Sequence, residues 1–172
     1  ASSVVKFNIL DAYLEHPPKT ILDIGCGIAE QSCLFAEKYN NIHITLIDGN
    51  ADDNIDEQNR SINFGSATSM RFYHNLHDIE QYIKKRIKHY TLIDCNNINI
   101  NSDIKFDVIY SWASCGFHYP LDTYRELCMK HSHKNTKLIF DIRTEYCTEQ
   151  SFKIVNILDS QEKKKTVEIK FI

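Results

Sequence analysis

Long apolar segments, paired cysteines and a strong excess of one charge are all missing from this 172-residue chain. No apolar run approaches the roughly 20 residues of a membrane-spanning helix, so we predict no membrane association. The six cysteines form no Cys-x-x-Cys pair and no metal-ligand spacing, which argues against a disulfide scaffold and a metal site. A net charge of -3 creates no overall field that would attract nucleic acid, so nucleic-acid binding is disfavoured.

The length and composition are those of a single globular domain, which we assign to residues 1–172. A chain of this size can bury one substantial core, and it contains no linker, repeat or low-complexity segment. The first ten residues do not have the charged start and long apolar stretch of a signal peptide, although an upstream segment could have been removed. Several cysteines lie inside apolar segments, where a free thiol behaves as a small hydrophobe. We therefore expect a reducing, cytoplasmic location.

The apolar pattern predicts strands that alternate with helices. Helical spacing occurs over residues 2–16, 29–39, 77–89 and 120–132, and near-continuous apolar runs at 20–25, 43–48, 90–94, 106–111 and 137–142 indicate buried strands. Residues 152–160 and 166–172 have the pattern of two more strands. The connection between them is too short for a helix, so we predict a hairpin. The pattern indicates an α/β fold with a mostly parallel sheet covered on both faces.

Two of the five glycines, Gly25 and Gly27, lie between the first strand and its helix. They could serve only a tight turn, but glycine there also allows a ligand to approach the backbone closely. Ligands of open α/β sheets bind at the carboxyl ends of the strands. A dinucleotide fingerprint would place Gly or Ala where this chain has Glu30, whose carboxylate would repel a pyrophosphate, so NAD is disfavoured. No Gly-Lys-Ser/Thr follows, which excludes a P-loop.

Aspartates end the next two strands. Asp48 is placed to accept hydrogen bonds from both hydroxyls of a ribose, although an Asp before Gly49 is also an ordinary turn signal. Asp94 could accept from an adenine amino group, or could cap the following loop.

The stretches "ILDIGCGIAE", "ITLIDGN", "YTLIDCNN", "FDVIYSWAS" and "KLIFDIR" together resemble the motif series of class I S-adenosylmethionine-dependent methyltransferases. The family's acid-x-Gly-x-Gly opening matches Asp23, Gly25 and Gly27, whereas its frequent third glycine is Ala29 here. The resemblance implies a three-layer αβα sandwich with a seven-stranded sheet whose last strand is antiparallel. It also implies S-adenosylmethionine as cofactor. The cofactor-binding residues that we predict on this basis are Asp23, Gly25, Cys26, Gly27, Asp48, Gly49, Asp94, Cys95 and Ser111. Trp112 is added because its ring could face the cationic sulfonium, although it could equally pack in the core.

A narrower resemblance links "RFYHNL" and "SWASCGFHYPLDTY" to the sugar O-methyltransferase type. The Asn/Asp-Pro-Pro-aromatic stretch of exocyclic-amine methyltransferases is replaced by Ser-Trp-Ala-Ser, which favours an oxygen acceptor. We therefore expect an enzyme that methylates a small molecule, with a sugar hydroxyl as the acceptor group. The alternatives are methylation of a protein or nucleic acid, and a non-catalytic subunit that only binds the cofactor.

The loop after the central strand, residues 112–120, carries the candidate catalytic residues. His118 is the candidate general base because imidazole is largely neutral at pH 7, although it could instead cap the following helix. Tyr119 could orient the acceptor or pack in the core. The polar segment 49–76 is a candidate lid, with disorder as the alternative. Tyr73 and Asn75 of this segment, together with His118 of the other loop, are predicted to bind substrate. Asp141 is a further candidate for contact with the acceptor.

Overall fold

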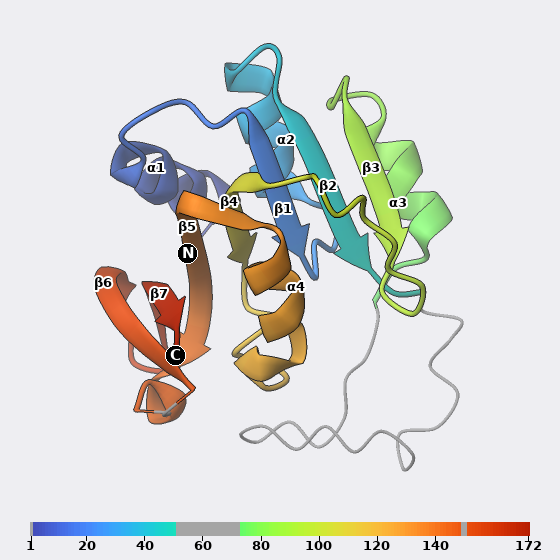
Figure 1. The fold of residues 1–172 in the computed structure, drawn as a ribbon. Coiled ribbons are helices and arrows are strands. Elements are labelled where there is room, and N and C mark those ends of the chain that lie inside the picture. The colour runs from blue at the N-terminus through green and yellow to red at the C-terminus, as the bar shows by residue number, and fades with distance from the viewer. Residues whose placement is uncertain (1, 51–72, 149–150) are drawn as a thin grey trace.

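The computed structural model describes residues 2–50, 73–148 and 151–172. Their strands form one seven-stranded sheet in the order β3-β2-β1-β4-β5-β7-β6 (Figure 1). The strands are β1 (Thr20–Ile24), β2 (His43–Asp48), β3 (Tyr90–Asp94), β4 (Phe106–Ser111), β5 (Ser132–Arg143), β6 (Phe152–Ser160) and β7 (Lys164–Phe171). The long interval 49–76 that sequence predicts to be a lid falls largely outside the described residues.

The directions in which the strands run confirm the predicted, mostly parallel topology. Strands β1 to β5 pair in parallel. Strand β7 inserts between β5 and β6 and runs antiparallel to both, with Leu138 opposite Ile169. The C-terminal hairpin therefore supplies the single strand of opposite direction, as the sequence predicts.

Helices α1 (Ser3–Tyr13), α2 (Glu30–Lys38) and α3 (Leu76–Ile83) lie on one face of the sheet. The short helix η3 (Leu121–Tyr124) and α4 (Arg125–Lys130) lie on the other, in front of the sheet in Figure 1. The 3-10 turn η4 (Thr144–Tyr146) follows β5. No described helix is both long enough and apolar enough to cross a membrane.

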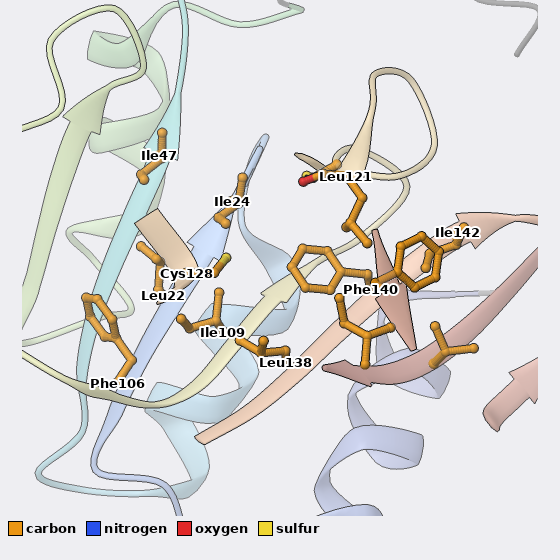
Figure 2. Close-up of a cluster of buried hydrophobic side chains, with 14 of the residues drawn as sticks. Leu22, Ile24, Ile47, Phe106, Ile109, Leu121, Cys128, Leu138, Phe140 and Ile142 are labelled. Carbon is orange, nitrogen blue, oxygen red and sulfur yellow. The ribbon is translucent and has the colours of Figure 1, made fainter. Parts of the chain in front are cut away.

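Two apolar cores form because successive strand residues point to opposite faces of a sheet. Ile21 of β1 and Val108 of β4 pack toward α1, α2 and α3. Their neighbours Leu22 and Ile109 pack toward Cys128 of α4. Figure 2 shows these three side chains close together, with Leu138 of β5 beside Ile109. Both faces of the central strands are thus buried, which explains their continuous apolar sequence.

Two predicted helices are shorter than expected. The 120–132 segment is divided into η3 and α4, and β5 begins at Ser132 instead of residue 137. The reason is pairing with β4: the backbone N–H of Phe106 donates to the carbonyl of His131 at 2.8 Å, and Ser132 is the strand partner of Phe106. Helix α3 ends at Ile83, short of the predicted residue 89.

Candidate functional site

A cavity of about 370 Å³ lies at the carboxyl ends of the central strands. This is the edge of an open α/β sheet where ligands bind, and the volume is within the range of small-molecule pockets. The wall residues come from the end of β2, from the segments that follow β1, β3 and β4, from α1, α2 and η3, and from the residues before α3. They are Lys6, Gly25, Cys26, Gly27, Gln31, Ile47, Asp48, Tyr73, His74, Cys95, Trp112, Ala113, Ser114, His118, Tyr119 and Tyr124.

The turn after β1 approaches the loop after β4 so closely that only glycine fits at position 25. Gly25 has a φ of +67°, and a Cβ there would lie 2.0 Å from Ser114 Oγ and 2.6 Å from Ser114 Cβ. The hydroxyl of Tyr119 hydrogen-bonds Ser114 Oγ at 2.9 Å. This contact therefore holds the first predicted cofactor turn against the predicted catalytic loop.

Gly27 serves a different purpose. Its φ is +55°, and a Cβ there would meet nothing within 4 Å, so the backbone borders open space in the cavity. Its N–H donates to Asp48 Oδ2 at 2.6 Å, and the N–H of Gly49 donates to Asp48 Oδ1 at 2.8 Å. Each carboxylate oxygen accommodates about two hydrogen bonds. Asp48 thus braces the turn and retains acceptor capacity toward the cavity it lines.

Asp23 lies beneath this turn and not in the cavity wall. Its side chain is buried, Oδ2 accepts from Ser32 Oγ at 2.7 Å, and Ser32 also contacts the hydroxyl of Tyr110. Oδ1 has no hydrogen-bond partner among the described residues. Burial in this apolar surrounding raises the pKa of Asp23 to about 7, because desolvation penalises the charged form.

The loop after β4 brings His118, Tyr119 and Trp112 into the cavity wall together. Burial, with the positive charge of Arg143, lowers the pKa of His118 below its ordinary value. The imidazole is therefore mostly neutral at pH 7, as a general base must be. Burial raises the pKa of Tyr119 well above its ordinary value, so its phenol stays protonated.

Five other predicted residues, like Asp23, lie outside the wall: Gly49, Asn75, Asp94, Ser111 and Asp141. Ser111 Oγ donates to the carbonyl of Ile24 at 2.8 Å and accepts from the N–H of Cys115 at 2.9 Å, which ties β1 to the loop. Asp94 Oδ1 caps the next turn by accepting from the N–H of Asn96 at 2.9 Å. Asn75 is the N-cap residue of α3, directly before Leu76.

Sequence reasoning missed the contribution of α1. Lys6 lies in the cavity wall and contacts Asp141, the buried aspartate near the end of β5. Spacing could not reveal this pair, because 135 positions separate the two residues. Gln31, Ser114 and Tyr124 also join the wall, and nothing in their local sequence marks them. Among the described residues no cluster of three or more potential metal ligands exists.

Similarity to known proteins is visible in structure alone. No family model and no curated protein sequence matches the chain. A methyltransferase from Pyrococcus furiosus superposes with a TM-score of 0.58 at 16% identity, over 100% of this chain and 84% of the other. The plantazolicin methyltransferase BpumL, in complex with a triazolic desmethylPZN analog and SAH, gives 0.57 at 16%, over 82% and 46%. Coclaurine N-methyltransferase, bound to N-methylheliamine and SAH, gives 0.54 at 12%, over 81% and 35%.

The chain thus spans less than half of two of these proteins and most of the third. It has the fold of the class I methyltransferases, with seven strands and the reversed strand β7 in the expected place.

Proposed function

We propose that the protein is an S-adenosylmethionine-dependent methyltransferase that acts on a small molecule, with a sugar hydroxyl as the acceptor group. The observation that carries this proposal is the cavity itself. Its wall contains both the Gly27–Asp48 turn and the loop with His118, on a fold shared with methyltransferases. One pocket therefore offers both a place for a nucleoside and a candidate base.

The residues present fit the cofactor. Open space faces Gly27, where any side chain would intrude, and Asp48 presents oxygens that can accept from ribose hydroxyls. When bound, S-adenosylmethionine supplies a methyl group on a positively charged sulfur. The aromatic ring of Trp112 in the wall suits a neighbouring cation, because the face of an indole ring is electron-rich.

His118 removes the acceptor proton in this proposal. With the cofactor bound, its sulfonium would supply the methyl group to the acceptor oxygen and leave as the neutral thioether, and the hydroxyl proton would pass to an imidazole nitrogen of His118. General-base assistance of this kind contributes roughly 10²- to 10⁴-fold, and alignment of the two reactants contributes more. Tyr119, protonated and hydrogen-bonded to Ser114, helps to fix the loop that holds the base.

Calorimetric titration with S-adenosylmethionine tests the cofactor step. We expect binding by the wild type and a loss of at least tenfold in Asp48→Ala, about 1.4 kcal/mol. Asp159→Ala is the control because it removes a carboxylate from the edge strand β6 that lies outside the cavity wall, and it should leave the affinity unchanged. No binding by the wild type would refute the proposal. Tight binding without transfer to any acceptor would instead favour a cofactor-binding subunit.

A further inference from the structure

Two lysines share one buried carboxylate beside the cavity. Asp141 is fully buried, and its Oδ2 lies 3.3 Å from Lys6 Nζ and 3.4 Å from Lys164 Nζ. The same oxygen accepts from the N–H of Ala113 at 2.9 Å, while Oδ1 accepts from Thr166 Oγ1 at 2.6 Å. Two ammonium groups against one carboxylate leave an excess of one positive charge in a site where both lysine side chains are about 15% exposed.

Of the two lysines, Lys6 is the one that brings positive charge to the cavity. Lys6 is in the cavity wall, whereas Lys164 and Asp141 are not. An ammonium has three donors, so Lys6 can serve Asp141 and a ligand at once. Burial lowers the pKa of Lys6, a cost that a bound anion would offset. Nearby, the indole N–H of Trp112 is buried and has no acceptor among the described residues, and Lys6 Nζ lies 5.8 Å from the Trp112 ring centre.

Lys6 lies on the side of the cavity formed by the ends of β4 and β5, away from the end of β2. Its contacts are with Asp141 on β5 and Trp112 after β4, whereas Asp48 ends β2. Three strand spacings separate β2 from β5 in the sheet, or about 14 Å. Asp48 is the only carboxylate among the described wall residues, and it is therefore too far away to neutralise Lys6.

We propose that Lys6 forms an anion-binding subsite that selects acceptors carrying a carboxylate or similar anionic group. The inference rests on the proposed methyltransferase function and narrows it: an acidic sugar, such as a uronate, fits this pocket better than its neutral counterpart. Asp141 and Lys164 position the Lys6 ammonium from behind and do not contact the ligand.

Glucuronate and glucose are suitable probes because they differ at one carbon, which carries a carboxylate in the first and a hydroxymethyl group in the second. Each is titrated by calorimetry into protein saturated with S-adenosylhomocysteine. We expect the wild type to bind glucuronate at least tenfold more tightly than glucose. Lys6→Met should abolish this preference, and Lys6→Arg should keep most of it, because arginine retains the charge but cannot act as a base.

Lys164→Met is the matched control, since it removes a nearly identical ion pair with Asp141 and leaves the cavity wall intact. Lys164→Met should lower the preference for glucuronate far less than Lys6→Met does. The two variants should change the thermal unfolding midpoint by similar amounts. Equal or absent binding of the two sugars by the wild type would overturn the proposal, as would a preference that survives in Lys6→Met or is lost in Lys6→Arg. Weaker S-adenosylhomocysteine binding in Lys6→Met would also overturn it, by assigning Lys6 to the cofactor carboxylate. If the wild type does not bind S-adenosylhomocysteine, the proposed function fails, while the sugar titrations without it still test the subsite.

Discussion

Replacing the two glycines of the first turn by alanine should separate a stability defect from a binding defect. Both residues have positive φ, but an added Cβ at Gly25 would lie 2.0 Å from Ser114 Oγ, and one at Gly27 would meet nothing within 4 Å. We therefore expect Gly25→Ala to destabilise the fold and Gly27→Ala to impair cofactor binding in a protein that remains folded.

The magnitudes follow from two contributions. An alanine held in the left-handed backbone region lowers the free energy of unfolding by roughly 1–2 kcal/mol. About 0.4–1 kcal/mol of this is regained because alanine restricts the unfolded chain more than glycine does. Gly27→Ala should thus lose about 1 kcal/mol of unfolding free energy. Gly25→Ala adds an overpacking penalty of roughly 1–3 kcal/mol, because Ser114 cannot easily retreat: its carbonyl accepts from the N–H groups of Phe117 and His118.

Urea unfolding followed by the fluorescence of Trp112, the single tryptophan, measures both variants. Adding Ser114→Gly to Gly25→Ala removes both clashing atoms and should restore at least about 1 kcal/mol relative to additivity. Calorimetry with S-adenosylmethionine should show Gly27→Ala weakened by at least tenfold. Equal stabilities of the two single variants, or an additive double variant, would refute the reasoning.

Two titrating groups give further predictions. The pKa of Asp23 is raised from 3.8 to about 7 in the folded protein, so its contribution to stability is fully present below pH 4 and is lost as the pH rises to 7. In urea unfolding, the wild type should lose about 4 kcal/mol of unfolding free energy over this range relative to Asp23→Asn. Parallel pH curves for the two proteins would contradict this. Since the pKa of His118 is lowered by burial and by Arg143, the acid limb of kcat/KM should lie below pH 6.5 and move upward in Arg143→Gln. His118→Gln should lower kcat by about 10²- to 10⁴-fold with unchanged cofactor affinity; an unchanged limb in this variant would exclude His118 as the base.

The sequence predicted the parts of the site that follow from strand order. The residues after β1, β2 and β4 converge because parallel strands end at one edge of the sheet, and so Gly27, Asp48 and His118 could be placed together in advance. The backbone conformation of the turns was harder to predict from the sequence. Ala29, at the place of the family's third glycine, adopts φ +57°, which only a glycine would have signalled.

Contacts between residues far apart in the sequence could not be predicted from the sequence at all. Lys6 and Asp141 meet because α1 packs beside the ends of β4 and β5, and neither residue carries a local motif. Their burial decides what the pair does. A surface ion pair contributes little, but a fully buried carboxylate requires partners, and this one holds Lys6 against the wall of the cavity.

The two ends of the cavity therefore have opposite character. Asp48 offers carboxylate oxygens to hydrogen-bond donors at the end of β2, while Lys6 offers a cation near β5. An anionic acceptor is repelled from the first end and attracted to the second, so charge alone directs it away from the nucleoside position. The reacting hydroxyl must then lie between Lys6 and the proposed cofactor position, and the loop bearing His118 borders that interval. On this argument, Lys6 sets the orientation of the acceptor and His118 removes its proton, so loss of either side chain should lower transfer while cofactor affinity stays unchanged.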